Sequence, residues 1–189
     1  MSYNNIADTD AAVALLREFE EPTVVAVKHA NPCGVGSAGS LLEAWQKAYE
    51  ADSVSIYGGI VAFNRIVDQA VAAATHGVFI EVMIAPDYTP DALALLQKRK
   101  NLRVLRLSDV ARPIDPHKHA IKHVYGGLLV QNEDTVVLDW ETCRTVTREQ
   151  VSDDQIEDLI FAMKVVKHTK SNAIVLAKDK QTVGIGPGQ

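Results

Sequence analysis

The stretch SIYGGIVAFNRIVDQAVAAATHGVFIEVMIAPDYTPDALALLQKRKNLRVLRL, residues 55–107, alternates between two hydrophobic patterns. Three short runs rich in β-branched residues are separated by two segments of helical composition, the first closed by Gly77 and the second entered at Pro90. Strands that alternate with helices in this way are typical of β-α-β units and of a largely parallel sheet. The stretch therefore predicts an α/β fold. The three predicted strands are 55–63, 79–86 and 102–107.

The alternation continues toward the N-terminus. Apolar residues at helical spacing predict a helix near 12–19, behind the capping candidates Asp8 and Thr9. A β-branched strand at 23–29 is expected to lead through a loop into a helix that a capping box at Ser40 opens. These segments add a strand, a loop and two helices to the predicted fold.

After residue 107 the regular alternation of strand and helix patterns ends. A hairpin is expected around 132–134, with 135–140 as its second strand. A second capping box, at Ser152, opens a helix that two more strands follow. Because no internal repeat and no linker are visible, residues 1–189 are predicted to form a single α/β unit.

Composition and charge limit the class of protein. The chain has 189 residues, 47% of them hydrophobic, which suffices for a substantial core without disulfides. A formal net charge of -5 does not favour nucleic acid or an anionic membrane. Cys33 and Cys143 are predicted to be free thiols, and no apolar run approaches the roughly 20 residues of a membrane span. We therefore expect a cytoplasmic protein with neither nucleic acid nor a membrane as partner.

One predicted strand ends in an unusual way, in the sequence VVAVKHANPCGVG, where four apolar residues run directly into Lys28 and His29. Successive side chains of a strand point to opposite faces, so both groups reach one pocket only where the chain bends. The segment 30–34 supplies such a bend. Spacing alone leaves open whether the two residues form an acid-base pair or a polar strand end before a turn.

A zinc site is a second interpretation of the same segment, because zinc deaminases combine an H-x-E motif with P-C-x-x-C. Here Asn31 stands where the glutamate of H-x-E should be, and Gly36 stands where the second cysteine should be. We expect no zinc, and Cys33 is predicted to be a small buried filler. Three further histidines are more typical of an exposed loop than of a metal site. They are His117, His119 and His123.

The glycine-rich segments leave several interpretations open. Residues 184–189 lack the third glycine and the helix of a dinucleotide-binding loop. The pair Gly58-Gly59 indicates either a bulge where backbone approaches a ligand or close packing in the core. Ser171 and Asn172 follow a cationic helix end, where an amide either orients a ligand or satisfies the last carbonyls of the helix.

Six motifs, in order along the chain, resemble the aminoimidazole carboxamide ribonucleotide (AICAR) transformylase domain of the bifunctional purine biosynthesis family. They cover most of the sequence between Ser2 and Gln189. The resemblance implies a cytidine-deaminase-like, three-layer α/β/α unit with a mixed sheet of largely parallel βα units. The motifs are KHANPCGVG, YGGIVAFNR, FIEVMIAPDYTPDAL, KRKNLRVL, VVKHTKSNAIVLAKD and VGIGPGQ.

The resemblance also implies a reaction, the transfer of a formyl group from 10-formyltetrahydrofolate to the 5-amino group of AICAR. That amine is a poor nucleophile and the folate nitrogen a poor leaving group, so the step needs a base, an acid and a fixed donor. By resemblance, His29 is the base and Lys28 the acid and electrostatic stabiliser. Asn172 matches the asparagine that orients both and the intermediate.

Seven further residues match substrate-binding positions of the family. Gly58 would let backbone approach the ligand, Glu81 stands at a position associated with the pterin ring, and Lys100 would face the substrate phosphate. The full set is Asn31, Pro32, Gly58, Glu81, Lys100, Ser171 and Gln189.

The same resemblance implies a homodimer that binds AICAR and the folate cosubstrate. The sequence does not indicate whether a monovalent cation also binds. Neither the cyclohydrolase domain nor a second transformylase subdomain matches any part of 1–189, so we expect a first subdomain that folds but does not catalyse formyl transfer alone. Two alternatives are a nucleotide-binding or oligomerising α/β domain without turnover, and a zinc nucleoside deaminase.

Overall fold

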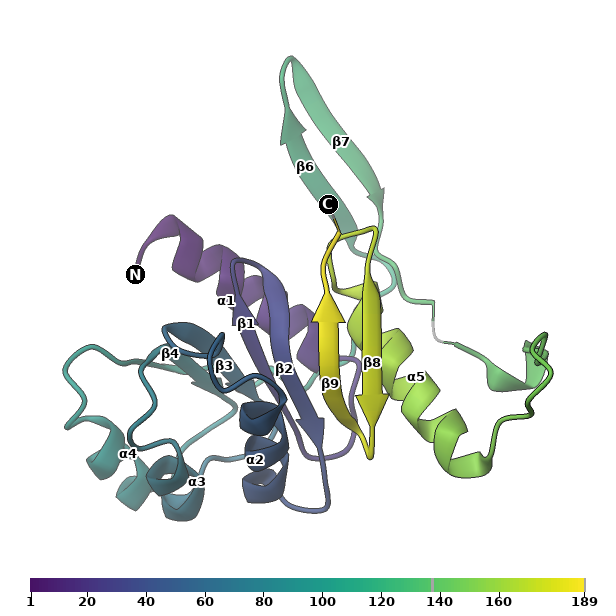
Figure 1. Ribbon diagram of the computed structural model, residues 1–189. Coiled ribbons are helices and arrows are strands. Elements are labelled where there is room, and N and C mark those ends of the chain that lie inside the picture. Colours follow the sequence, from purple (N-terminus) through teal and green to yellow (C-terminus); the bar gives the residue numbers. More distant parts are fainter. Residues whose placement is uncertain (137, 189) are drawn as a thin grey trace.

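The computed structural model describes residues 1–136 and 138–188 (Figure 1). Helices and strands alternate through most of this range. The helices are α1 Tyr3–Leu16, α2 Leu41–Ala51, α3 Gln69–Ala74, α4 Pro90–Leu96, α5 Asp153–Lys167 and the 3-10 helix η1 Trp140–Thr142. The strands are β1 Thr23–Lys28, β2 Asn31–Ser37, β3 Gly59–Phe63, β4 Ile80–Ala85, β5 Arg103–Arg106, β6 His119–Val124, β7 Gly127–Asn132, β8 Ile174–Lys178 and β9 Gln181–Gly186.

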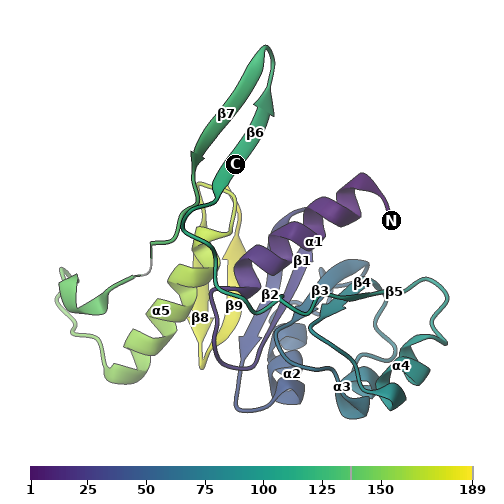
Figure 2. The ribbon, with the colours of Figure 1, turned by 180° about the vertical axis from the view of Figure 1, so that it is seen from behind.

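In the described residues, one sheet holds seven strands in the order β5-β4-β3-β1-β2-β9-β8. Helices α2, α3 and α4 cover one face of this sheet, and α1 and α5 cover the other (Figures 1 and 2). The alternation of β1 serves both layers, because Val24 and Ala26 pack toward α2 while Val25 and Val27 pack toward α1. Full burial of one such valine stabilises the fold by about 1.5–3 kcal/mol. The predicted α/β class, three layers and mixed sheet are confirmed.

The strands of the βα units predicted in 55–107 pair in parallel, as expected, but the parallel pairing does not extend to the rest of the sheet. Only β3-β4 and β4-β5 pair in parallel among the described strands, whereas the pairs β1-β2, β1-β3, β2-β9 and β8-β9 are antiparallel. The cause lies in the segment after β1, which does not form the expected loop. His29 and Ala30 make a tight turn with φ of 53° and 57°, and β2 returns directly alongside β1.

Two parts of the chain fold in the same way, and the prediction of no internal repeat is wrong. Helix α1 with the hairpin β1-β2, and α5 with the hairpin β8-β9, each begin at the serine of a capping box, Ser2 or Ser152. In each unit a helix aspartate accepts hydrogen bonds from both backbone N–H groups of the hairpin turn, 21 and 22 residues further on. The aspartates are Asp8 and Asp158. The units share this geometry more than residue identities, so the repeat is hard to see in the sequence.

The repeat extends to the strand register. Pairing shifts between Ala26 and Val27 in β1, and between Leu176 and Ala177 in β8, at matching places in the two hairpins. Strands β2 and β9 are antiparallel neighbours at the junction of the two units. The β1-β2 turn and the β8-β9 turn therefore lie at opposite ends of the sheet (Figure 1).

Several element boundaries differ from the prediction. Helix α1 begins after Ser2, whose capping box with Asn5 replaces the expected caps at Asp8 and Thr9. At Ser40 the side chain accepts a hydrogen bond from the backbone N–H of Glu43, so the N-cap is confirmed, but the reciprocal bond that would complete the predicted capping box is absent from the described residues. The capping box at Ser152 is confirmed.

The hairpin predicted around 132–134 is wrong. The observed hairpin lies earlier in the chain and consists of β6 and β7. Its turn is at Tyr125 and Gly126, where the glycine has a φ of 82°. The expected second strand, 135–140, includes Val137, which lies outside the described residues, and its last residue begins η1. The hairpin β6-β7 projects away from the sheet (Figure 1). None of the described helices is both long enough and apolar enough to span a membrane.

Candidate functional site

Four strands bring the predicted site residues to one end of the sheet. Because β3 is antiparallel to β1 and parallel to β4, the end of β1 lies beside the beginnings of β3 and β4. The antiparallel pairs β1-β2, β2-β9 and β9-β8 place the beginning of β8 at the same end. We call this the site end; Lys28, Gly59, Ile80 and Ile174 are the strand residues that border it.

Lys28 and His29 occupy the tip of the first hairpin. The Lys28 Nζ donates a hydrogen bond of 2.5 Å to the backbone carbonyl of Tyr57, a neutral acceptor, and no ion pair involves Lys28 among the described residues. His29 is exposed, and its backbone N–H donates to the carboxylate of Asp8 at 3.1 Å. The tight turn is the bend that brings both side chains to one depression.

Asn172 and Ser171 lie close to this hairpin tip. The Asn31 Oδ1 accepts a hydrogen bond of 3.1 Å from the backbone N–H of Lys170, which ties the segment after α5 to the first hairpin. The backbone of Gly188 also packs closely on this segment. A Cβ added to Gly188 would lie 2.1 Å from the backbone N of Asn172, so a glycine is needed there. Asn31, Ser171 and Asn172 are therefore neighbours at the site end.

Gly58 and Glu81 complete the same end of the sheet. Gly58 has a φ of 73°, and a Cβ at this position would lie 4.0 Å from the Lys28 Nζ. Glu81 lies at the register shift between β3 and β4, where its Oε2 accepts a hydrogen bond of 2.7 Å from the Asn5 side chain of α1. Gly58 thus approaches Lys28, whereas Glu81 contacts α1 at the same end of the sheet.

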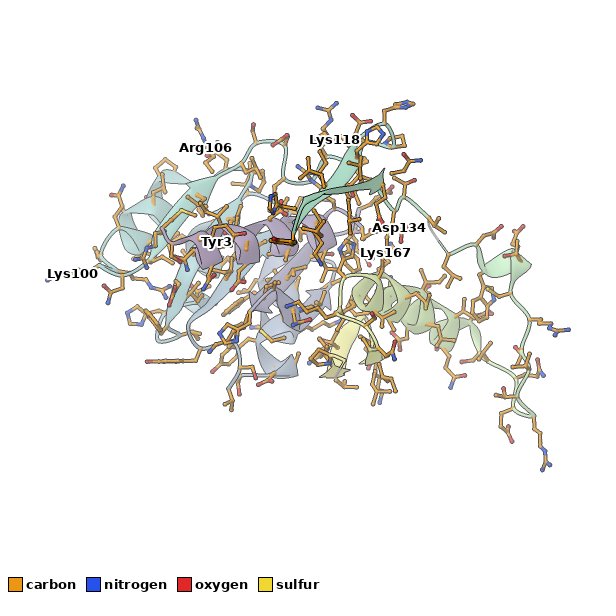
Figure 3. All side chains as sticks on the ribbon, turned by 90° about the horizontal axis from the view of Figure 1, so that it is seen from above. Tyr3, Lys100, Arg106, Lys118, Asp134 and Lys167 are labelled. Carbon is orange, nitrogen blue, oxygen red and sulfur yellow. The ribbon has the colours of Figure 1, made fainter. Side chains whose placement is uncertain are left out.

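Two predicted residues are not part of this group. Lys100 is exposed and lies at the margin of the molecule, far from the base of the β6-β7 hairpin at Lys118 and Asp134 (Figure 3). It shares a shallow hollow with Phe79, the residue beneath Gly58, but no hydrogen bond or ion pair joins it to the site end among the described residues. Gln189 lies outside the described residues.

A depression of about 550 Å³ opens beside the hairpin tip. Its lining comes from the hairpin tip, from the end of α2 with the segment after it, and from β9 with the segment after it: Lys28, His29, Asn31, Pro32, Ala51, Asp52, Ser55, residues 182–185 and Pro187. Cys33 lies at its floor, where burial and the nearby Asp52 carboxylate raise the pKa of the thiol to about 12. The thiol is therefore protonated at neutral pH and a weak nucleophile or metal ligand, in keeping with a packing role.

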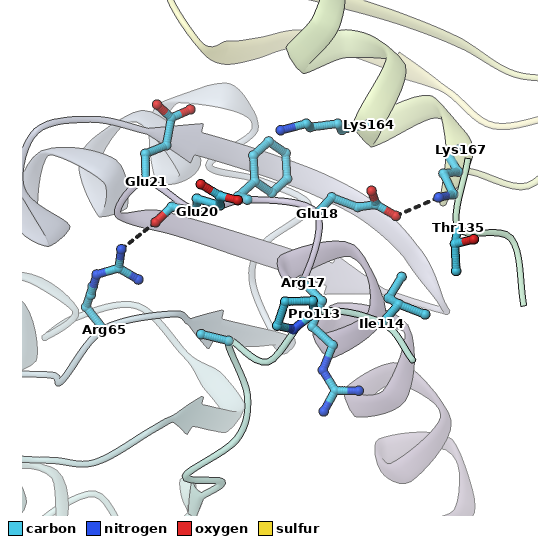
Figure 4. Close-up of a pocket in the computed structure, with 12 residues that line it drawn as sticks. Arg17, Glu18, Glu20, Glu21, Arg65, Pro113, Ile114, Thr135, Lys164 and Lys167 are labelled. Atoms are coloured by element: carbon cyan, nitrogen blue, oxygen red, sulfur yellow. Dashed lines mark hydrogen bonds and ion pairs between the residues drawn. The ribbon is translucent and has the colours of Figure 1, made fainter. Parts of the chain in front are cut away.

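A second cavity, of about 890 Å³, lies between the end of α1 and α5 (Figure 4). Its cations are already engaged: Arg65 donates to the carbonyl of Glu20, and the Lys164 ammonium lies 5.1 Å from the centroid of the Phe19 ring. Lys167 pairs with Glu18 at 2.9 Å. Although larger, this cavity holds none of the predicted site residues and offers an anionic ligand little free positive charge.

Glu18 joins the two helices across this cavity. Its carboxylate, 8% exposed, contacts Lys167 and, at 2.8 Å, the Nε2 of His168 just before the Ser171-Asn172 segment. Burial alone would raise the pKa of Glu18, but hydrogen bonds and charge from His168 and Lys167 outweigh it, and the pKa is lowered below its usual 4.5. Glu18 thus anchors the C-terminal end of α5.

Replacing Glu18 by glutamine should lower the free energy of unfolding at neutral pH by roughly 1.5–3 kcal/mol, the range for hydrogen bonds to charged groups. Because the pKa of Glu18 is lower in the folded state, its contribution is present above pH 4.5 and is lost as the pH falls through the folded value. Urea unfolding at neutral and acid pH measures this. If both proteins lost stability equally in acid, the ion pairs would be unimportant.

In the described part of the chain, no three histidine, cysteine, aspartate or glutamate side chains gather into a group that could hold a metal ion. The expected exposed loop is wrong for two of the three histidines, because His119 and His123 lie on the exposed strand β6. His117 precedes the strand in a turn that Asp115 stabilises. That no zinc binds remains a prediction.

Sequence reasoning missed Asp8 and Asn5. Both lie on α1, and both bind segments of the site end: Asp8 holds the turn at His29 and Ala30, and Asn5 holds Glu81. The only signal in the sequence is the equal spacing of Asp8 and Asp158 from their hairpin turns.

Comparison with known proteins identifies the family to which the chain belongs. The family model described as AICARFT/IMPCHase bienzyme matches residues 1–189, so the chain belongs to this family, and the resemblance seen in the motifs is confirmed.

Individual relatives are named bifunctional purine biosynthesis protein PurH. Those of Acetivibrio thermocellus and Ruminiclostridium cellulolyticum are each 53% identical to this chain over 189 residues, and that of Limosilactobacillus reuteri is 51% identical. Each match covers 100% of this chain but 37% of the relative. The chain thus spans little more than a third of the length of these relatives.

Proposed function

We propose that this chain supplies catalytic residues for the transfer of a formyl group from 10-formyltetrahydrofolate to the 5-amino group of AICAR, a step of purine (IMP) biosynthesis in the cytoplasm. The observation that carries the proposal is the meeting of two segments at the site end. Lys28 and His29 at one hairpin tip are joined through Asn31 and Lys170 to the segment of Asn172, more than a hundred positions away along the chain.

The groups at the site end have the chemistry that the reaction needs. His29 is exposed to the depression and takes the proton of the attacking amine as a general base. Lys28, whose ammonium donates to a carbonyl and makes no ion pair among the described residues, gives a proton to the leaving folate nitrogen. Asn172 donates to the oxyanion of the tetrahedral intermediate.

The remaining predicted residues have binding roles in this proposal. Gly58 lets the folate approach the backbone, and Glu81, held by Asn5, contacts the pterin ring. Asn31, Pro32 and Ser171 contact the nucleotide. Lys100 and Gln189 are proposed as two further substrate-binding residues, Lys100 for the phosphate.

We further propose that residues 1–189 form the first subdomain of the transformylase domain, with the cytidine-deaminase-like layers that the family resemblance implies, and that strands β8 and β9, at one edge of the sheet, pack against the second subdomain. On the face where β2 has α2, that helix reaches β9, but no described helix covers β8. Ile174, Leu176 and Val183 of these two strands are more than half exposed. The complete protein is proposed to bind AICAR and the folate as a homodimer, without zinc.

Hydrogen exchange tests the location of the site. In a hybrid protein, residues 1–189 replace the matching segment of the Acetivibrio thermocellus relative. Exchange is then followed by mass spectrometry with and without AICAR. Peptides that contain 24–33, 55–63 and 168–175 should gain protection, because they form the site end.

Peptides from the second cavity, which contain Arg65 or Lys164, serve as the internal control and should be unchanged. Protection of these peptides alone would move the nucleotide to the cavity between α1 and α5 and overturn the proposed site.

A further inference from the structure

The turn that carries His29 has a conformation that its residues do not favour. Both His29 and Ala30 adopt positive φ, 53° and 57°, where hairpins of this type ordinarily use asparagine and glycine. A histidine and an alanine in this region are strained, so contacts from outside the turn must hold it. The position of His29, the catalytic base in the proposed function, therefore depends on the residue that makes these contacts.

Asp8 supplies these contacts. Its Oδ2 accepts the backbone N–H of His29 at 3.1 Å, and its Oδ1 accepts that of Ala30 at 2.8 Å. A carboxylate that accepts two N–H groups makes charge-assisted bonds, stronger than neutral ones. Asp8 is half-buried on α1, a rigid helix packed on the sheet, so it fixes the turn relative to the core.

The unit of α5, β8 and β9 contains the same arrangement of an aspartate and a hairpin turn, but its turn carries none of the proposed catalytic residues. The Asp158 carboxylate accepts the backbone N–H groups of Asp179 and Lys180 at 2.9 and 2.8 Å, and both residues again have positive φ. That turn is also fastened by side chains, since Lys180 pairs with Glu21 and with Glu157 at 3.2 and 3.1 Å. In the described residues, no ion pair involves His29, whose side chain faces the open depression.

We propose that Asp8 is a positioning residue for formyl transfer, which holds the backbone of His29 so that its imidazole enters the depression beside Lys28. This inference rests on the proposed function. Asp8 does not touch the reacting atoms and acts only through the turn. Asp158, which makes the same two bonds at the opposite end of the sheet, stabilises its turn without any effect on the reaction.

The repeat provides a matched control for the test. Asp8→Ala and Asp158→Ala each remove two equivalent hydrogen bonds, so both should cost similar stability in the hybrid protein. Asp8→Ala should lower kcat by about 10²-fold, the cost of a misplaced catalytic group, with KM for AICAR little changed. Asp158→Ala should leave kcat unchanged. Asp8→Asn, which keeps one acceptor, should fold normally and show an intermediate loss of kcat.

A second readout is independent of turnover. In the 189-residue chain, amide exchange measured by NMR should accelerate at His29 and Ala30 in Asp8→Asn, but at Asp179 and Lys180 in Asp158→Asn. Unchanged exchange at His29 would overturn the claim that Asp8 holds the turn.

The outcomes separate the two proposals. If the unsubstituted hybrid transfers formyl groups and Asp8→Asn retains full kcat, or if both aspartate variants lose kcat equally, the positioning role is wrong while the proposed function stands. If the unsubstituted hybrid binds AICAR but transfers no formyl group, the proposed function fails and the positioning role fails with it.

Discussion

Replacing His29 by alanine should lower the rate of formyl transfer by the hybrid protein by about 10²–10⁴-fold, the usual contribution of a general base. Lys28→Ala should have an effect of similar size, because the folate nitrogen leaves badly without a proton. Both residues lie at the hairpin tip, where their side chains contribute little to the core, so the fold should survive. Release of tetrahydrofolate, followed by absorbance, measures the rate.

His123→Ala is the matched control for the first substitution. His123 is also an exposed histidine of a hairpin, but it lies on strand β6, in the hairpin that projects away from the sheet (Figure 1). Its replacement should leave the rate unchanged. A His29→Ala protein that retained the unsubstituted rate would remove His29 from the mechanism.

Replacing Gly34 by alanine should destabilise the 189-residue chain by about 3 kcal/mol or more. A Cβ on Gly34 would lie 2.1 Å from the backbone carbonyl oxygen of Ala48, so α2 would have to move away from β2. This would open the core that the two elements share. Thermal unfolding followed by circular dichroism should show Tm lowered by roughly 6–12 °C.

The internal repeat again supplies the control. Gly184 occupies the matching position of β9, where the nearest atom to an added Cβ is the Leu176 Cδ1 at 3.7 Å. Gly184→Ala should therefore be neutral or slightly stabilising. Equal losses of Tm in the two variants would mean that the packing of α2 does not explain the glycine in β2.

Much of the fold could be predicted from local signals. Ser152 as a capping residue and Pro90 at the start of α4 identified helix ends, because caps and proline act within one turn. The direction of the strands could not be predicted in this way. In the segment after His29, a proline and two glycines are typical of a loop, yet they lie in β2.

The structure gives the physical reason for each of these residues. Pro32 lies where the register of β1 and β2 shifts, a place where a strand tolerates proline. Gly34 and Gly36 are needed because α2 packs directly on their backbone. Proximity of a helix, which depends on tertiary structure, thus produces the same residue pattern as a turn.

The candidate site was predictable only in part for a similar reason. Lys28 and His29 are conspicuous because charged groups seldom end a buried strand, and Asn172 was found by resemblance. Asp8 resembles any solvated helix aspartate in the sequence, and its role becomes visible only when α1 lies against the first hairpin. Residues that hold a site from another element leave little local signal.

The central claim is that residues 1–189 provide the acid-base pair for formyl transfer. The most direct test is the initial rate of tetrahydrofolate release when the unsubstituted hybrid protein is mixed with AICAR and 10-formyltetrahydrofolate. We predict a rate comparable to that of the unaltered Acetivibrio thermocellus relative, measured beside it, and its near-complete loss when Lys28 and His29 are both replaced by alanine. A folded hybrid that binds AICAR yet releases no tetrahydrofolate, or a doubly substituted one that keeps the full rate, would contradict the claim.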